Sequence, residues 1–239
     1  MKIRGRRECQ DCGTQWSYYD TGDVACPDCE SLRSVGVDER TRHTDTPTQL
    51  DLTAHKAAIG DVEGIPRELV KDLKSELRGY LRKRGFINEG QLRPPTDTYL
   101  VARELLEAVD VYHRTRQPAA ADKLYLLKLL KGADVDRRPP AEEVPEILYP
   151  ARGIAIARTV ELFRDDLTEY LDENPNQDAR AVSGQLRERA KRIDALQGNV
   201  EPSEAEPLVR ATRDLVAALE GVTNTSLASI SDTLSQQTS

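Results

Sequence analysis

The stretches Cys9-Gln10-Asp11-Cys12-Gly13 and Cys26-Pro27-Asp28-Cys29 contain all four cysteines of this 239-residue chain. Each has C-x-x-C spacing, in which the backbone bends so that both sulfur atoms point to one side. Two such pairs facing each other supply the four thiolates that a structural Zn²⁺ prefers. The thirteen residues between the pairs are slightly fewer than the roughly 15 to 20 usual for such sites, but they still allow a hairpin. We therefore predict a metal site formed by Cys9, Cys12, Cys26 and Cys29.

The residues between and after the cysteine pairs predict a small antiparallel sheet. Thr14–Tyr19 has the aromatic and β-branched content of a strand, and Asp20–Asp23 has the composition of a turn. Leu32–Val37 alternates apolar and polar residues and adds a third strand. A unit this small buries too little surface to fold alone, so metal binding is expected to stabilise it. The sequence thus predicts a three-stranded zinc ribbon over residues 1–40.

The spacing Cys9-x-x-Cys12-Gly13, Trp16, Cys26-Pro27-x-Cys29 resembles the zinc ribbon of transcription factor IIB and its archaeal counterpart. It resembles still more closely a family of uncharacterised haloarchaeal proteins with a ribbon of that type. The chain departs from the pattern at Glu30, where such ribbons usually have Gly, and it lacks the two cyclin-like repeats of a true factor IIB. The resemblance implies one structural zinc ion and a ribbon that contacts protein or nucleic acid in the transcription or translation machinery.

Six ribbon residues are the partner contacts that this resemblance implies: Arg4, Arg6, Arg7, Trp16, Tyr18 and Arg33. Aromatic faces can stack on bases, and arginine can bind phosphate. In the alternative interpretation, Trp16 packs as the core of the ribbon and the arginines are merely solvated. A protein partner is expected, and a nucleic-acid partner is the alternative.

Iron is an alternative metal, because C-x-x-C-G and C-P-x-C also resemble rubredoxin-type knuckles. A di-iron helical bundle of the rubrerythrin type would need Glu-x-x-His motifs on two helices. The chain has only His43, His55 and His113, and none of them follows a glutamate by three residues. The di-iron site is therefore excluded, whereas a single iron in the cysteine site stays possible. His43 and His55 are expected to be solvated.

The composition indicates a soluble cytoplasmic protein. The net charge is −7 and 38% of the residues are hydrophobic, and the sequence has neither a signal peptide nor an apolar run long enough to cross a membrane. Cysteines confined to one cluster suit a reducing compartment. Arginine outnumbers lysine 25 to 9, and this acidic, arginine-rich composition resembles that of proteins from salt-loving archaea. No region is basic enough to indicate tight, autonomous binding to duplex DNA.

A mostly α fold is expected, with a linker at 41–62, a helical domain at 63–220 and a flexible tail at 221–239. Apolar residues at helical spacing predict about six helices, at 66–84, 96–113, 118–130, 154–171, 177–197 and 206–219. The first should end with Gly85 as its C-cap. Its last turns carry Arg78, Arg82, Lys83 and Arg84. These cations are expected to favour the helix dipole, and a site for phosphate or an acidic partner is the alternative.

Nothing in the helical region matches the phosphate-binding, dinucleotide-binding or hydrolase motifs. We therefore expect no catalytic residues; the candidate in the alternative interpretation is His113, near Asp110. The alternative hypothesis is an enzyme or a ligand-binding helical domain, with a pocket lined by His113, Tyr112 and Tyr125 and with the ribbon as a folding staple.

Overall fold

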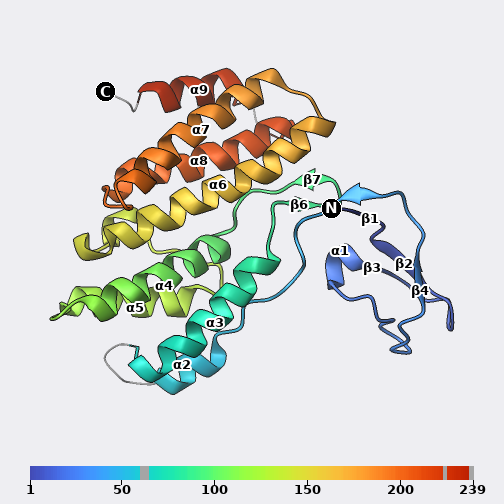
Figure 1. Ribbon diagram of the computed structural model, residues 1–239, viewed down its shortest axis with the longest axis horizontal. Helices are drawn as coiled ribbons and strands as arrows, with labels where there is room; N and C mark the ends of the chain where they lie inside the picture. The colour runs from blue at the N-terminus through green and yellow to red at the C-terminus, as the bar shows by residue number, and fades with distance from the viewer. Residues whose placement is uncertain (60–64, 223–224, 237–239) are drawn as a thin grey trace.

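The computed structural model describes residues 1–59, 65–222 and 225–236. It confirms the predicted class, a small N-terminal ribbon followed by a helical body (Figure 1). The strands are β1 (Lys2–Ile3), β2 (Arg6–Cys9), β3 (Gln15–Ser17), β4 (Ser34–Gly36), β5 (Thr41–Arg42), β6 (Ile87–Asn88) and β7 (Gln91–Leu92). The α-helices are α1 (Tyr18–Thr21), α2 (Thr53–Ile59), α3 (Arg67–Lys83), α4 (Asp97–Arg114), α5 (Ala120–Gly132), α6 (Tyr149–Glu173), α7 (Gln177–Ala195), α8 (Pro202–Leu219) and α9 (Leu227–Gln236).

The ribbon sheet has three antiparallel strands in the order β3-β2-β4. Its central strand is Arg6–Cys9, a segment for which no strand was predicted. The strand expected to run through Tyr19 ends instead at Ser17, and the chain turns into α1. The buried Tyr19 explains this turn: its hydroxyl accepts a hydrogen bond from the Gly5 N–H at 3.1 Å and pairs with Thr41 Oγ1 at 2.7 Å.

The ribbon is attached to the helical body through strand pairs and ion pairs. β1 pairs with β5, and the Gly90 N–H of the β6–β7 hairpin donates to the Arg42 carbonyl at 2.9 Å. Arg42 also binds two carboxylates of α6, those of Glu169 at 2.7 Å and Glu173 at 2.9 Å. These contacts fix the direction in which the ribbon projects from the body (Figure 1).

The segment expected to be a linker has structure of its own in its described part. It contributes β5 and α2, and it buries Leu50 and Leu52. His43 and His55, which were expected to be solvated, are buried. His43 packs its ring against Tyr19 with centroids 5.0 Å apart, and His55 Nε2 lies 2.9 Å from Glu76 Oε2. Residues 60–62 of the expected linker lie outside the described residues.

The six predicted helices correspond to α3–α8, and α1, α2 and α9 are additional. The tail expected to be flexible contains α9, which packs against α7 and α8 and buries Ile230 and Leu234. These two residues are four apart, so they lie on one face of the helix. The Ser- and Thr-rich composition around them obscured this short apolar stripe.

Side-chain caps define the N-termini of α4 and α7, whereas a tertiary contact accompanies the C-terminus of α3. Thr96 caps α4 by accepting from the Tyr99 N–H, and Asn176 caps α7 by accepting from the Ala179 N–H. The expected C-cap at Gly85 is wrong, because α3 ends with Arg84 in extended backbone. Gly85 instead packs closely against Thr44: a Cβ atom added at Gly85 would lie only 2.4 Å from Thr44 Oγ1.

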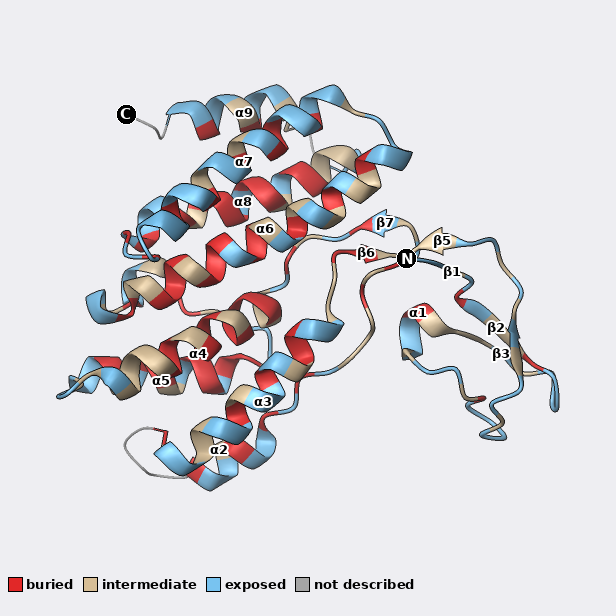
Figure 2. Cartoon of the chain, viewed as in Figure 1, coloured by how far each residue is buried: buried red, intermediate tan, exposed pale blue. Residues whose placement is uncertain are grey.

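The core of the helical body surrounds α6, which packs against α4, α7 and α8. Figure 2 shows the buried residues concentrated between these helices, whereas the ribbon is mostly exposed. The body also buries a charged group, Arg152, which is 2% exposed and pairs with the fully buried Glu104 at 2.7 Å. Among the described residues, no helix combines the length and apolar character needed to cross a bilayer.

Candidate metal centre

The two cysteine pairs form backbone turns of the same construction. In the first, the Gly13 N–H donates to the Cys9 carbonyl at 3.0 Å, and the Cys9 N–H donates to the Thr14 carbonyl at 2.9 Å. In the second, the Glu30 N–H donates to the Cys26 carbonyl at 2.9 Å, and the Cys26 N–H donates to the Ser31 carbonyl at 2.9 Å. The C-x-x-C spacing therefore produces two matching hooks that face each other.

The four sulfur atoms converge on one point, all lying within 4.8 Å of one another. Cys9 Sγ is 3.6 Å from Cys29 Sγ, and Cys12 Sγ is 3.5 Å from Cys26 Sγ. These separations are far longer than the roughly 2.05 Å of a disulfide. A tetrahedron with metal–sulfur bonds of about 2.3 Å has sulfur atoms roughly 3.8 Å apart. The cluster thus has the size that a tetrahedral S₄ metal site requires, and the residues present fit a metal ion.

Side chains around the cluster connect the two hooks. Thr14 Oγ1 donates to Asp28 Oδ2 at 2.6 Å, and Arg33 Nη1 donates to Asp11 Oδ1 at 2.8 Å. Cys9 Sγ accepts from the Asp11 N–H at 3.4 Å. Such outer contacts orient the ligands and stabilise negative charge on sulfur. They hold the sulfurs in place from both sides of the cluster.

The cluster is buried on one side and exposed on the other. Cys9 and Cys26 are buried, whereas Cys12 and Cys29 are exposed. The side-chain and backbone hydrogen bonds of Thr14 lower the pKa of Cys12 to about 6. At Cys29, the Ser31 N–H lowers the pKa, but the Cys12 sulfur and burial act in the opposite direction and raise it to about 12. Four adjacent thiolates repel one another, so a bound cation would favour full deprotonation.

Two of the predicted partner contacts serve the ribbon itself. Arg7 Nε donates to Ser34 Oγ at 2.9 Å across the sheet. Trp16 is half-buried, and its Nε1 donates to the Asp23 carbonyl at 3.0 Å. Arg7 and Trp16 are register partners on adjacent strands, so they share one face of the sheet. That face supports the segment leading to the second cysteine pair.

The remaining predicted contacts lie in different environments. Arg4 and Arg6 are exposed, and Arg6 lies 3.9 Å from Glu89 at the hairpin of the body. Arg33 is exposed but paired with Asp11. Tyr18 belongs to α1 rather than a strand, and its ring lies 6.0 Å from that of His43. The six residues therefore do not form one surface.

The outer face of the ribbon sheet carries exposed apolar side chains that the sequence analysis did not single out. Val35 is 41% exposed and Val37 is 48% exposed, and the nearby Leu32 is 73% exposed. Val35 and Arg6 lie on the face opposite Cys9, because side chains alternate along a strand. The alternation of residues 32–37 was visible in the sequence. A sheet without a second layer leaves such residues in solvent.

The three aromatic residues of the expected catalytic pocket do not come together. Tyr125 is buried, and its hydroxyl lies 2.5 Å from Glu104 Oε1 in the middle of α4. His113 and Tyr112 lie near the end of α4 and contact each other edge to face. Glu104 and His113 are nine residues apart on that helix, or roughly 13 Å along its axis.

Comparison with known proteins gives one family. The model of a family of unknown function, DUF7117, matches residues 1–234 and so runs through both the ribbon and the helical body. No curated protein and no solved structure matches the chain.

Proposed function

The chain belongs to the DUF7117 family, whose function is unknown, and we propose that it is a zinc-ribbon adaptor that acts by binding another protein. The observation that carries this proposal is the convergence of four cysteine sulfurs within 4.8 Å. One Zn²⁺ bound by Cys9, Cys12, Cys26 and Cys29 would fasten the two hooks and supply folding free energy to a ribbon with a thin core. Its role is structural, since four protein ligands leave no open position for a substrate.

The type of ribbon supports a partner in the gene-expression machinery. The spacing of the cysteine pairs, with Trp16 between them, is similar to that of the transcription-factor-IIB ribbon. The helical body, in place of cyclin-like repeats, points to an adaptor or regulator rather than an initiation factor. The single cysteine cluster and the acidic surface fit a cytoplasmic protein of a salt-rich cell.

The surface of the ribbon favours a protein partner over nucleic acid. Of the eleven exposed large apolar residues in the described chain, five lie in residues 1–40. Three of those five, Leu32, Val35 and Val37, lie within six positions. Apolar side chains beside arginines are typical of protein interfaces. Residues 1–45 have seven basic and nine acidic groups, a net charge of −2 that does not favour binding to phosphates.

The ion pairs between the ribbon and the body give the adaptor a defined geometry. Arg42 is bound to Glu169 and Glu173 of α6, and Lys2 also lies 3.3 Å from Glu173. A protein bound to the ribbon is therefore held in a set orientation to the helical surface. The body can scaffold a second contact in this arrangement.

The proposal is tested by separating the metal site from the docking face. The purified protein should contain one zinc ion per chain, and Cys26→Ser should lose it. The double variant Val35→Ser/Val37→Ser should retain zinc but lose transcription or translation proteins from the set captured in extract of the native cells. The control is Leu124→Ser/Leu196→Ser, which removes two exposed apolar residues from the helical body.

Two results would contradict the adaptor function. The first is a protein that folds without stoichiometric metal, and the second is an unchanged set of captured proteins for the Val35→Ser/Val37→Ser variant. The second result would support the alternative in which the ribbon only stabilises the fold. If the protein contained one iron ion per chain and no zinc, the metal would be iron rather than zinc, and the test of the docking face would still apply.

A further inference from the structure

A cavity of 510 Å³ is lined by residues of α3, α4 and α6 and by the loop of Arg84, Gly85 and Phe86. It is separate from the cysteine cluster, and its size falls in the range of small-molecule sites, roughly 300 to 1,000 Å³. Four arginines line it: Arg78 and Arg82 from α3, Arg103 from α4, and Arg84 from the loop after α3. Their convergence in a chain of net charge −7 requires an explanation.

Three of these arginines have no partner of opposite charge among the described residues. Within the described residues, Arg78, Arg82 and Arg103 take part in no ion pair, and Arg103 Nη2 donates a hydrogen bond to the Tyr99 hydroxyl at 2.9 Å. Arg78 and Arg82 are four residues apart, so their like charges are neighbours on one face of α3. Arg84, by contrast, is neutralised by Asp45 at 2.6 Å. The cationic wall is therefore made by Arg78, Arg82 and Arg103.

Arg103 provides an independent sign that an acceptor belongs in this region. Its Nε is buried and has no hydrogen-bond partner in the structure. A buried donor of a charged group without a partner is costly, and it is rare in folded proteins. The guanidinium carbon lies 5.6 Å from the centroid of the Tyr99 ring. A phosphate oxygen is the acceptor that suits such a planar group.

The rest of the lining combines apolar side chains with two carboxylates, Asp165 and Asp166. Leu81, Phe86, Leu106 and Leu162 form the apolar part, and Leu162 is 43% exposed. Asp166 is already engaged, since it accepts from the Phe86 N–H at 2.6 Å and from Thr44 Oγ1 at 2.7 Å. Asp165 is exposed and lines the same cavity. The cavity thus offers cations, an apolar surface and one carboxylate, Asp165, that is unpaired among the described residues.

We propose that this cavity binds a small organic phosphate, the class that includes nucleoside monophosphates. The phosphate contacts Arg78, Arg82 and Arg103, and the organic part lies on Leu81 and Leu162. A hydroxyl of the ligand donates to Asp165. Inorganic phosphate uses only the arginines and leaves the apolar lining in water, so it binds more weakly than an organic phosphate.

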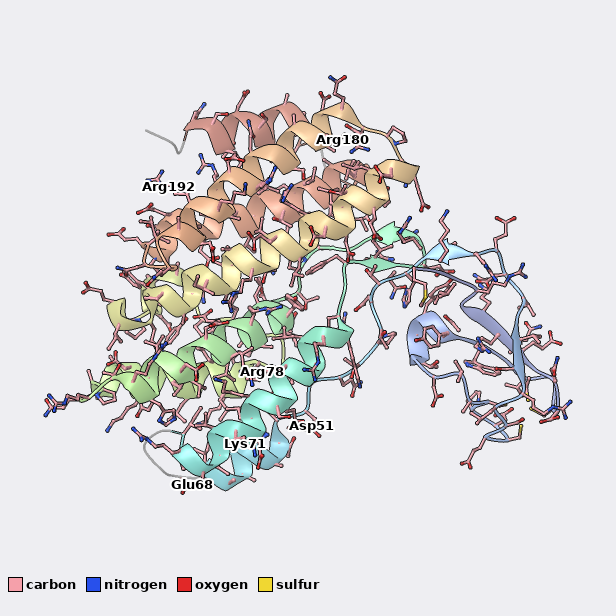
Figure 3. All side chains as sticks on the ribbon, in the orientation of Figure 1. Asp51, Glu68, Lys71, Arg78, Arg180 and Arg192 are labelled. Carbon is pink, nitrogen blue, oxygen red and sulfur yellow. The ribbon has the colours of Figure 1, made fainter. Side chains whose placement is uncertain are left out.

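The test is calorimetric titration of the full-length protein with AMP, glycerol 3-phosphate and inorganic phosphate at one fixed salt concentration. At least one organic phosphate is expected to bind, and more tightly than inorganic phosphate. Arg103→Gln and Arg78→Gln/Arg82→Gln should each weaken that binding tenfold or more. Lys71→Gln is the matched control, because Lys71 lies two turns before Arg78 on α3 and outside the cavity (Figure 3). It should change the affinity by less than twofold.

Circular dichroism of each variant should retain the helical signal, which separates loss of the site from loss of the fold. The ribbon variant Val35→Ser/Val37→Ser should bind the organic phosphate unchanged, so this site is tested independently of the adaptor function. The proposal is overturned if none of the three probes binds, or if the arginine variants bind them as well as Lys71→Gln does. It is also overturned if inorganic phosphate binds as tightly as both organic phosphates.

Discussion

Gly13 and Glu30 occupy the same position in the two cysteine hooks, and both have left-handed backbone, with φ of 79° and 58°. Each N–H closes its hook by donating to the first cysteine of the pair. Glycine adopts this conformation freely, whereas a residue with a Cβ atom is strained by roughly 1–2 kcal/mol. The departure at Glu30 from the usual glycine is thus accommodated by strain and not by a different turn.

Replacing Glu30 by glycine should relieve that strain. Part of the gain is offset by the greater freedom of glycine in the unfolded chain, so we expect Glu30→Gly to stabilise the metal-bound ribbon by about 0.7 kcal/mol, or roughly threefold in apparent zinc affinity. Gly13→Ala should weaken it by a similar factor or more. Competition with a zinc chelator measures both. Glu39→Gly is the control, because Glu39 is not among the residues with positive φ, and a tightening as large as that of Glu30→Gly would contradict the explanation.

The buried pair of Glu104 and Arg152 should be among the most sensitive positions of the helical body. Arg152 is also bound to Glu206 at 2.7 Å and to the Pro139 carbonyl at 3.0 Å. Glu104→Leu removes one of the two counter-ions of a buried guanidinium, and we expect a loss of about 3 kcal/mol or more in unfolding free energy. Urea denaturation measures the loss.

The control for this variant breaks an exposed pair. Arg180 and Asp172 are 3.0 Å apart, with side chains 47% and 64% exposed. Asp172→Asn should change the unfolding free energy by no more than about 0.5 kcal/mol. If Glu104→Leu and Asp172→Asn lowered the unfolding free energy equally, burial would not determine how much an ion pair contributes to stability.

Gly85 and Gly79 should respond to alanine in opposite directions. At Gly85 the new Cβ would lie 2.4 Å from Thr44 Oγ1 and 2.6 Å from the Thr44 backbone, so the β6 connection must move and the protein should lose about 1–3 kcal/mol. Gly79 lies inside α3 with nothing within 4 Å of its Cβ position. Gly79→Ala should therefore stabilise the protein by about 0.5–1 kcal/mol. Thermal unfolding distinguishes the two, and stabilisation by Gly85→Ala would refute the close contact with Thr44.

His43 should make the stability depend on pH. Burial lowers its pKa, and the amino terminus acts in the same direction, whereas Asp45 raises it less than burial lowers it. The folded chain therefore binds the proton less readily than the unfolded chain. The stability that neutral His43 contributes is fully present above about pH 6.5, and it is lost as the pH falls below that value. His43→Phe keeps an aromatic ring beside Tyr18 and Tyr19 but does not titrate. Unfolding measured from pH 7.5 to 5 should show a smaller loss for the variant, and identical profiles would rule out this role.

The features predicted correctly from the sequence depend on residues close together in the chain. The cysteine cluster follows from two C-x-x-C pairs, each closed by hydrogen bonds within six residues. The helices α3–α8 follow from apolar residues repeated at helical spacing, such as Leu73, Leu77 and Leu81. The prediction of secondary structure failed at α9, where the apolar pattern is short. It also failed at Tyr19, whose side chain packs against residues distant in the sequence.

The sequence by itself therefore determined the four-cysteine cluster, the order of ribbon and helical body, and most of the helices, because spacing and periodicity act over one or two turns of the chain. Only the tertiary structure decided which distant side chains meet. It brought Arg78 and Arg103 to one cavity, joined Arg152 to Glu104, and fastened the ribbon through Arg42 to α6. These contacts depend on how helices pack against one another, and the packing direction of a helix is set by the whole core rather than by its own residues.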